Sequence, residues 1–115
     1  MQNILVTGGA GYIGSHIVEL LIKKKLNVII LDNLSTGYKK LINKKGKFIK
    51  GDIKDLNILK IVIKAENITS IIHLAACLNV DEAENKPQKY YKNNVLGTLN
   101  LVKACKSSKV KNIIF

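Results

Sequence analysis

The sequence predicts an α/β protein built as a Rossmann-type, doubly wound parallel sheet that is cut short after about five strands. Short apolar runs alternate along the chain with longer segments whose apolar residues recur at helical spacing. A glycine-rich turn joins the first apolar run to the first helical segment. Parallel strands need a crossover connection, usually a helix, and these crossovers are right-handed. The 115 residues are therefore expected to form one domain with helices on both faces of the sheet.

The first part of the chain is expected to supply two strands and the helix between them. Asn3 to Thr7 predicts a strand, because its apolar run is continuous and ends at glycines, as in a strand buried on both faces. Gly11 to Lys24 predicts a helix, since lysines gather at its end, where cations suit the helix dipole. The expected apolar face of this helix consists of Ile13, Ile17, Leu20 and Leu21. Val28 to Leu31 predicts the second buried strand, which a polar loop follows.

The rest of the chain continues the alternation. Phe48 and Ile49 mark a short third strand, and Asp55 can cap a helix whose apolar face is Leu56, Leu59 and Ile63. Ser70 to Ala76 predicts a fourth strand, and Tyr90 to Lys106 predicts a long helix. One side of that helix is expected to be lined by Val95, Leu99, Val102 and Cys105. Asn112 to Phe115 begins a fifth strand.

Composition and charge limit the kinds of partner that the chain is expected to bind. The formal net charge is +11, from 19 basic and 8 acidic residues, but every basic residue is a lysine and the lysines are scattered. Arginine is the residue favoured for recognising phosphate and guanine through two parallel hydrogen bonds. No apolar run approaches the ~18 residues that a membrane helix needs. The sequence thus predicts neither a nucleic-acid partner nor a membrane partner.

The cysteines and histidines are too few and too far apart to form a disulfide framework or a metal site. Cys77 and Cys105 stand in apolar surroundings, which favours a reducing compartment, and the chain opens with a strand pattern rather than a targeting signal. A cytoplasmic location is expected. The two histidines and two cysteines lack the spacing of zinc ligands, so no metal is expected.

Gly9, Gly11 and Gly14 form a G-x-G-x-x-G pattern between the first strand and the first helix. In such a turn the first glycine permits the tight bend, the second lets a pyrophosphate approach the backbone, and the third lets the helix pack close to the sheet. Asp32 ends the second strand, 18 residues after Gly14 (32 − 14), where a carboxylate can accept hydrogen bonds from a ribose. A carboxylate also repels a 2′-phosphate, so NAD is favoured over NADP. The alternative is a flexible turn followed by an acid that merely starts a loop.

Five ordered motifs resemble those of the extended short-chain dehydrogenase/reductases. They are Thr7 to Gly14, Leu31 to Gly37, Gly51 to Ile53, His73 to Ala76, and Tyr90 to Thr98. The resemblance covers essentially the whole chain. Within this family, the run Asp-Asn-Leu-Ser-Thr-Gly is typical of sugar-nucleotide epimerases, and the chain looks most like the UDP-glucose 4-epimerases.

The resemblance implies an NAD site in which each residue has a place along the cofactor. It puts the pyrophosphate beside Gly8, Gly11, Tyr12, Ile13 and Gly14, the adenosine ribose beside Asp32 and Asn33, the adenine beside Asp52 and Ile53, and the path to the nicotinamide beside Ala75 and Ala76, with Asn94 anchoring that last segment. It assigns no catalytic residue and no metal ligand to this chain.

For several of these residues a purely structural interpretation stays open. Asp52 could be a loop acid, and Asn94 could be a polar group on a helix surface. His73 ends a buried strand, and a hydrogen-bonded core histidine is expected there rather than a proton shuttle. His16 is expected on the surface.

The sequence departs from the epimerase pattern at three places. Many epimerases have a lysine where Leu78 stands, and the family's usual serine is Ala83 here. Both departures concern the substrate side of the site. Lys25 and Leu26 replace the glycine that commonly ends the first helix, so that helix must be terminated in another way.

The family's catalytic Tyr-x-x-x-Lys pair does not occur in this chain. The residues four positions after Tyr12, Tyr38, Tyr90 and Tyr91 are His16, Ile42, Asn94 and Val95. The chain is therefore predicted to be the NAD-binding part, residues 1–115, of an epimerase that interconverts UDP-glucose and UDP-galactose through a 4-keto sugar, and to be inactive by itself. The full-length protein is expected to bind a nucleotide sugar and to form a homodimer. Another nucleotide-sugar epimerase, a 4,6-dehydratase or a non-catalytic dinucleotide-binding module would share most of these features.

Overall fold

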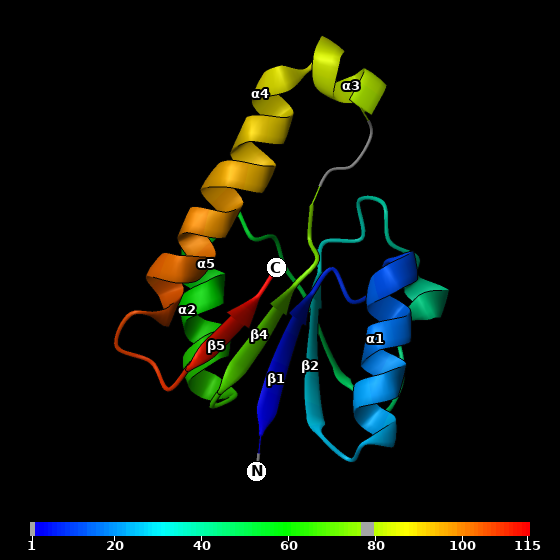
Figure 1. Cartoon of the computed structure of the whole chain (residues 1–115), viewed down its shortest axis with the longest axis vertical. Helices are drawn as coiled ribbons and strands as arrows, with labels where there is room; N and C mark the ends of the chain where they lie inside the picture. Colours follow the sequence, from blue (N-terminus) through cyan, green and yellow to red (C-terminus); the bar gives the residue numbers. More distant parts are fainter. Residues whose placement is uncertain (1, 77–79) are drawn as a thin grey trace.

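The computed structural model describes residues 2–76 and 80–115, which form a five-stranded, fully parallel sheet (Figure 1). The strands are β1 (Asn3–Thr7), β2 (Asn27–Asp32), β3 (Lys47–Lys50), β4 (Ser70–His73) and β5 (Asn112–Ile114). Their order across the sheet is β3-β2-β1-β4-β5. The chain thus adds β2 and β3 on one side of β1, and then adds β4 and β5 on the other side. The carboxyl ends of β1 and β4 mark this change of direction, where doubly wound folds bind their ligands.

Helices cover both faces of the sheet, as the alternating sequence pattern predicts. The helical segments are α1 (Tyr12–Lys23), the short η1 (Lys39–Leu41), α2 (Leu56–Ala65), α3 (Val80–Asn85), α4 (Pro87–Tyr90), the π-helical turn η2 (Tyr91–Leu96) and α5 (Gly97–Cys105). Helix α1 lies on one side of the sheet, whereas α2 and α5 lie on the other (Figure 1). None of the helices in the described ranges is long and apolar enough to cross a membrane.

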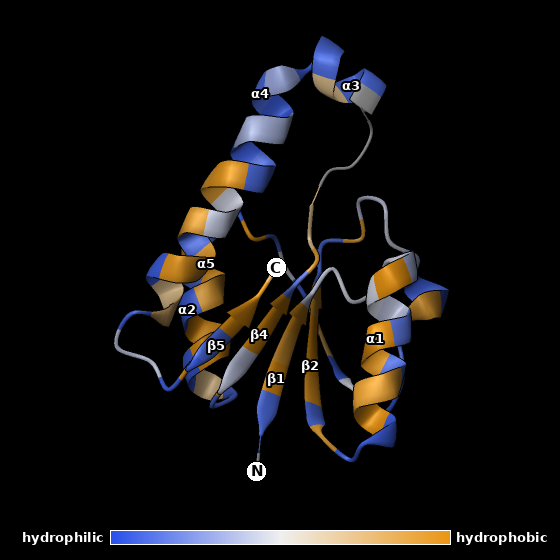
Figure 2. Cartoon of the chain, in the orientation of Figure 1, coloured by the Kyte–Doolittle hydropathy of each residue, from blue (hydrophilic) through white to orange (hydrophobic). Residues whose placement is uncertain are grey.

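The two sides of the sheet bury separate apolar clusters, because successive side chains of a strand point to opposite faces. The cluster under α1 contains Ile4, Val6, Val18, Val28 and Ile30. The larger cluster, under α2 and α5, contains Leu5, Ile29, Leu31, Ile71, Leu59, Val62, Ile63 and Leu101. Figure 2 shows the apolar residues concentrated along the strands. Burial of both faces explains why the strands are continuous apolar runs rather than alternating ones.

Helix α1 buries only part of the face predicted for it: Leu21 packs against the cluster under the helix, but two other predicted residues point to solvent. Ile13 and Leu20 are 59% and 55% exposed, while Gly14 and Val18 are buried. Because Gly14 has no side chain, the helix lies close to the sheet along the Gly14–Val18 stripe, and Ile13 turns outward. Apolar residues occur on both sides of this helix, so their spacing alone did not identify the buried side.

Helix α1 ends without the glycine that the family usually provides. Lys25 takes the left-handed conformation itself, with φ of 62°. Its N–H donates to Ile22 O at 2.8 Å, and Leu26 N–H donates to Leu21 O at 3.2 Å. These two bonds form a Schellman cap, which a lysine adopts at a cost of about 1 kcal/mol relative to glycine.

The predicted long helix is present but differs in its start, its regularity and its buried face. Helical structure begins at Pro87 and contains the π-helical turn Tyr91–Leu96. The predicted apolar face is wrong at three of its four residues: Val95, Leu99 and Val102 are 40–48% exposed, whereas Cys105 packs against the larger apolar cluster as predicted. The residues that α5 buries are Gly97, Leu101 and Ala104. A Cβ atom at Gly97 would lie 2.5 Å from Ile53 Cδ1, so close packing selects the side of the helix with small residues.

The remaining differences concern short segments. Asp55 caps α2 as predicted, accepting from Asn57 N and Ile58 N at 3.0 and 3.3 Å. Strand β4 ends at His73 rather than Ala76, and α3 was not predicted. Cys105 is a half-buried free thiol whose pKa is raised by burial. Cys77 and Leu78 lie outside the described residues.

Candidate cofactor site

A cleft with a volume of about 800 Å³ lies at the carboxyl ends of the strands. Eleven of the twelve residues predicted for the cofactor site line it: Gly8, Gly11, Tyr12, Ile13, Gly14, Asp32, Asn33, Asp52, Ile53, Ala75 and Ala76. Asn94 does not line it, but its neighbour Asn93 does. The volume of the cleft falls in the range of pockets that bind small molecules and cofactors.

The glycine turn between β1 and α1 forms the floor of this cleft, and its glycines have different structural reasons. Gly8 has φ of 76°, and a Cβ atom there would lie 2.8 Å from Ala75 N. A Cβ atom at Gly14 would lie 2.1 Å from Gly8 O. A Cβ atom at Gly11 would meet only Gly8 O, at 3.3 Å. Packing therefore requires glycine at positions 8 and 14, whereas the open space over Gly11 leaves room for another molecule.

The amino terminus of α1 opens onto the same space. Gly11 is the N-cap residue, no side chain caps the helix, and its first turn contains no acidic residue. The first backbone N–H groups of a helix have no partner within the helix and carry partial positive charge. This arrangement suits an anion such as a pyrophosphate.

Asp32 ends β2 beside the turn, and the residue is only 8% exposed. One oxygen accepts from Ala10 N at 3.0 Å and the other accepts from Leu34 N at 2.8 Å. Leu34 has φ of 62°, so the carboxylate holds a strained residue as well as the glycine turn. Asp32 thus positions two loops of the cleft, a role that the sequence pattern did not indicate.

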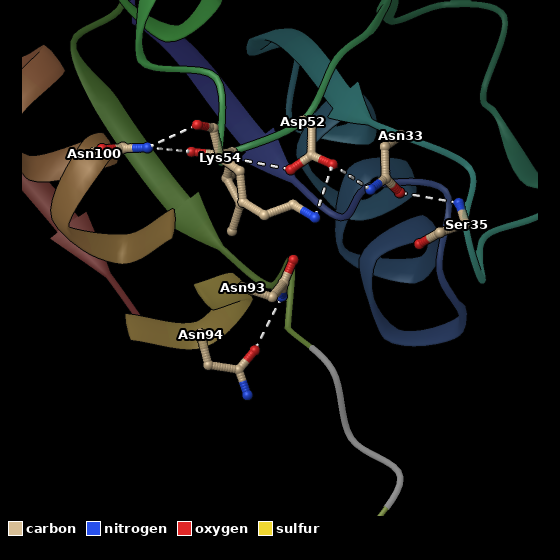
Figure 3. Close-up of polar contacts among 8 residues, drawn as sticks. Asn33, Ser35, Asp52, Lys54, Asn93, Asn94 and Asn100 are labelled. Carbon is tan, nitrogen blue, oxygen red and sulfur yellow. Dashed lines mark hydrogen bonds and ion pairs between the residues drawn. The ribbon is translucent and has the colours of Figure 1, made fainter. Parts of the chain in front are cut away.

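Asn33 and Asp52 join the ends of β2 and β3 (Figure 3). Asn33 Nδ2 donates to Asp52 Oδ2 at 3.0 Å, and Lys54 Nζ lies 3.8 Å from the same oxygen. Burial raises the pKa of Asp52, but the backbone N–H of Lys54, the Asn33 amide and the Lys54 charge outweigh it and lower that pKa overall. Asp52 is therefore an ionised part of the cleft wall, tied to Asn33.

Asparagines of η2 and α5 lie near Asp52: Asn93 and Asn94 on η2, and Asn100 on α5 beside Lys54 (Figure 3). Asn93 Nδ2 donates to Asn94 Oδ1 at 3.0 Å. Asn100 Nδ2 donates to the carbonyls of Ile53 and Lys54 at 3.2 and 3.0 Å, and so ties α5 to the loop after β3. Nothing in the sequence pattern pointed to Asn100, which forms this contact across 46 residues.

His73 is a buried, hydrogen-bonded histidine, as predicted. Its Nδ1 lies 2.6 Å from Thr7 Oγ1 and its Nε2 lies 3.1 Å from Thr98 Oγ1. The ring of Phe115 packs edge-on against it, with centroids 5.8 Å apart. His73 also lines the cleft, whereas His16 is exposed on α1.

A family model described as the NAD dependent epimerase/dehydratase family matches residues 4–115. The chain belongs to this family. UDP-glucose 4-epimerase of Lactobacillus helveticus is 44% identical over 114 residues, covering 99% of this chain and 34% of that protein. The enzyme of Haemophilus influenzae is 43% identical over 119 residues, covering 97% and 35%. The chain therefore spans about a third of the length of these curated relatives.

Solved structures of the epimerase/dehydratase family have the same fold. UDP-glucose 4-epimerase of Thermotoga maritima, solved with UDP-glucose, gives a TM-score of 0.96 at 37% identity and covers 99% of this chain and 37% of its own. The enzyme of Thermus thermophilus, in complex with NAD, gives 0.95 at 38% identity with the same coverage. The part that matches this chain is thus 37% of each of those enzyme chains.

Several residues that the sequence did not predict for the cofactor site also line the cleft. They are Ser35, Thr36, Gly37 and Tyr38 of the loop after β2, and Glu82, Lys89, Tyr90 and Asn93 of the segment from α3 to η2. Glu82 and Lys89 form an ion pair, and Tyr90 Oη donates to Glu82 at 3.4 Å. The motif Asp-Asn-Leu-Ser-Thr-Gly could have indicated Ser35, Thr36 and Gly37 but not Tyr38, which follows it. Within the described ranges, no group of three or more His, Cys, Asp or Glu residues could hold a metal ion.

Acid is expected to destabilise the fold through His73. Burial lowers the pKa of His73 below its ordinary value of 6.5. As the pH falls through 6.5, the unfolded chain binds a proton that the folded chain does not, so the free energy of unfolding decreases. The stability that neutral His73 contributes is therefore complete above pH 6.5, and it is lost as the pH falls toward the lower pKa that His73 has in the folded state. Asp52 affects stability in a separate pH range. Its pKa is lowered in the folded chain, so the stability that it contributes is lost only as the pH falls below 3.8, the ordinary pKa of an aspartate.

Urea unfolding at about pH 7.5 and about pH 5.5 measures this effect. The loss of stability should disappear in His73→Phe and persist in His16→Gln, which changes the exposed histidine. An identical loss in all three proteins would assign it to other groups.

Proposed function

We propose that residues 1–115 form an NAD-binding domain. The observation that carries this proposal is the amino terminus of α1, which begins after Gly11, has no side-chain cap and faces the cleft. The Asp32 carboxylate lies at the end of the neighbouring strand and lines the same cleft. Packing requires a glycine at position 11 far less than at positions 8 and 14, because a Cβ atom there would meet a single atom, Gly8 O at 3.3 Å, which would have to move by only a few tenths of an ångström.

The cleft residues would hold NAD by their chemistry. The backbone N–H groups behind Gly11, Tyr12 and Ile13 suit the pyrophosphate. Asp32 can accept from ribose hydroxyls with the lone pairs that Ala10 and Leu34 leave unused. The remaining predicted residues would act farther along the cofactor: Asn33, Asp52 and Ile53 at the adenosine, and Ala75, Ala76 and Asn94 toward the nicotinamide.

We further propose that the domain is part of a UDP-glucose 4-epimerase. The epimerases of Thermotoga maritima and Thermus thermophilus were solved with UDP-glucose and with NAD, and they and the enzyme of Lactobacillus helveticus align over 99% of this chain. When bound, NAD would supply a hydride acceptor for the fourth carbon of the sugar. The product would be the epimeric sugar, so that UDP-glucose and UDP-galactose interconvert by way of a 4-keto sugar. We also propose a cytoplasmic location, since a chain with so few cysteines, of which Cys105 is unpaired, suits a reducing compartment.

The domain should bind NAD more tightly than NADP. The 2′-phosphate of NADP would approach the Asp32 carboxylate, and the like charges and lost ribose hydrogen bond should cost at least about 1.4 kcal/mol, a factor of ten in affinity. Calorimetric titration of the 115-residue chain with each cofactor measures the ratio. Equal affinities would remove Asp32 from the ribose position, and the absence of any NAD binding would overturn the proposed domain function.

The 115-residue chain alone should not interconvert UDP-glucose and UDP-galactose. It contains no Tyr-x-x-x-Lys sequence and spans about a third of its relatives' length, so the base that takes the sugar proton would lie in another part of the protein. A coupled assay with a full-length relative as the positive control tests this. Turnover above the enzyme-free rate would show that the chemistry resides in residues 1–115.

We also propose that the longer protein is a homodimer. Helix η2–α5 exposes an apolar stripe of Val95, Leu96, Leu99 and Val102, each 40–48% accessible. Such a stripe on a helix is an expected site of association with another subunit. Light scattering of the longer protein should give the mass of two chains, and leucine-to-glutamate changes at positions 96 and 99 should reduce it to one.

A further inference from the structure

The hydroxyl of Thr7 has all its hydrogen-bonding capacity in use. Its oxygen accepts from Leu74 N at 3.1 Å and from Ala75 N at 3.3 Å, and it contacts His73 Nδ1 at 2.6 Å. A hydroxyl oxygen has two acceptor positions and one hydrogen. Ala75 N–H occupies one acceptor position, and Leu74 N–H, which also donates to the Thr7 backbone carbonyl at 3.0 Å, is shared with the other. The hydrogen of Thr7 is therefore directed at His73 Nδ1.

The hydroxyl of Thr98 leads to the same assignment from the other side of the ring. Thr98 Oγ1 lies 2.7 Å from the Asn94 carbonyl oxygen, which can only accept, so Thr98 donates its single hydrogen there. The contact of 3.1 Å with His73 must then be a donation from His73 Nε2–H to Thr98. Both neighbours of the ring thus require a neutral imidazole with its hydrogen on Nε2.

We propose that His73, as the Nε2–H tautomer, is a positioning residue that holds three walls of the cofactor cleft in register. Through Thr7 it holds the glycine turn and the segment 74–76, and through Thr98 it holds the π-helical turn Tyr91–Leu96, which presents Asn93 to the cleft. The inference rests on the proposed NAD-binding function, because its consequence is a loss of cofactor affinity.

Burial and close packing make this link stiff. Thr7 is fully buried and His73 is 9% exposed, so water has little access to replace a lost partner. The Gly8 backbone touches the 74–75 backbone so closely that a Cβ atom would be 2.8 Å from Ala75 N. A displacement of the 74–76 segment would therefore move the glycine turn, and both line the cleft.

The tautomer can be measured directly, without any cofactor. His16 Nδ1 lies 2.8 Å from the Tyr12 carbonyl oxygen, so a neutral His16 carries its hydrogen on Nδ1. Long-range ¹H–¹⁵N correlation spectra of the 115-residue chain should show the Nε2–H pattern for His73 and the opposite pattern for His16. An Nδ1–H pattern for His73, or signals averaged between tautomers, would overturn the proposal.

A matched pair of variants tests the effect on the cleft. Thr98→Val keeps the shape of the side chain but leaves His73 Nε2–H without its acceptor, and it should weaken NAD binding about five- to ten-fold. Thr98→Ser restores the hydroxyl and should restore the affinity. Thr69→Val removes a comparable hydroxyl, bonded to Asn3 at the opposite end of the sheet, and should leave NAD affinity unchanged.

The outcomes separate this inference from the proposed function. If the wild-type chain binds no NAD, the domain function is wrong, while the tautomer measurement still stands. If the wild-type chain binds NAD and Thr98→Val binds it equally well, His73 does not position the cleft. If Thr69→Val weakens binding as much as Thr98→Val at equal melting temperature, the effect is one of general stability and the proposal fails.

Discussion

Gly11→Val is expected to remove NAD binding and to leave the fold intact. The valine Cβ would meet only Gly8 O, at 3.3 Å, and the extended conformation of residue 11 (φ −80°, ψ 176°) suits a β-branched residue. Its methyl groups would fill the space over the helix terminus and deny the pyrophosphate its backbone donors. Losing two charge-assisted hydrogen bonds should cost about 3 kcal/mol, a factor of roughly 100 in affinity. Calorimetry measures the affinity, and circular dichroism checks the fold.

Gly14→Ala is the matched variant in the same turn, with the opposite expected result. Its Cβ would lie 2.1 Å from Gly8 O, a backbone atom that cannot move without moving β1. The helix must shift away from the sheet, at an expected cost of about 1–3 kcal/mol in the free energy of unfolding. Wild-type stability in Gly14→Ala would contradict the packing role of Gly14. Wild-type NAD affinity in Gly11→Val would contradict the role of Gly11 in admitting the pyrophosphate.

Asp32→Ala is expected to lose stability as well as cofactor affinity. The substitution leaves the N–H groups of Ala10 and Leu34 without their acceptors in a largely buried position. A buried donor without a partner costs about 1–3 kcal/mol, so the free energy of unfolding should fall by at least about 2 kcal/mol. NAD affinity should fall with it, because the glycine turn loses the bond at Ala10. Urea unfolding and calorimetry measure the two effects.

Asp32→Asn separates the charge from the hydrogen bonds. The amide keeps one oxygen and can still accept from either Ala10 or Leu34, so it should unfold less easily than Asp32→Ala. It removes the negative charge, so it should narrow the preference for NAD over NADP. If both variants keep wild-type stability, the two hydrogen bonds from Ala10 and Leu34 contribute nothing to it, and Asp32 acts on the cofactor alone.

The parts of the fold that the sequence predicted correctly are those with local causes. The strand Asn3–Thr7, the turn after it and the cap at Asp55 each follow from a few adjacent residues. The predicted faces of α1 and α5 were right only at Leu21 and Cys105, because both helices carry apolar residues on two sides. The choice between the sides depends on where Gly14 and Gly97 allow close approach, which is a property of the neighbouring elements.

The candidate site divides in the same way. Its glycines and Asp32 belong to a compact motif, so their grouping could be predicted. The bonds of Asn100 to the loop after β3 and of His73 to Thr98 join segments that no local pattern relates. The π-helical turn that places Asn93 on the cleft also has no recognised signal in these residues.

The strand order has a consequence for how the protein folds. Thr7 and His73 are neighbours across β1 and β4, although they are 66 residues apart, whereas Asn3 and Asn27 join β1 to β2 across only 24 residues. Closing the longer loop costs about 0.9 kcal/mol more in chain entropy. The half containing β1, β2 and β3 is therefore expected to assemble first, and pulse-labelled amides of β2 should become protected before those of β4. The cleft spans the seam between the two halves, so a cofactor could bind only after the last closure and would act on folding by slowing the reopening of that seam.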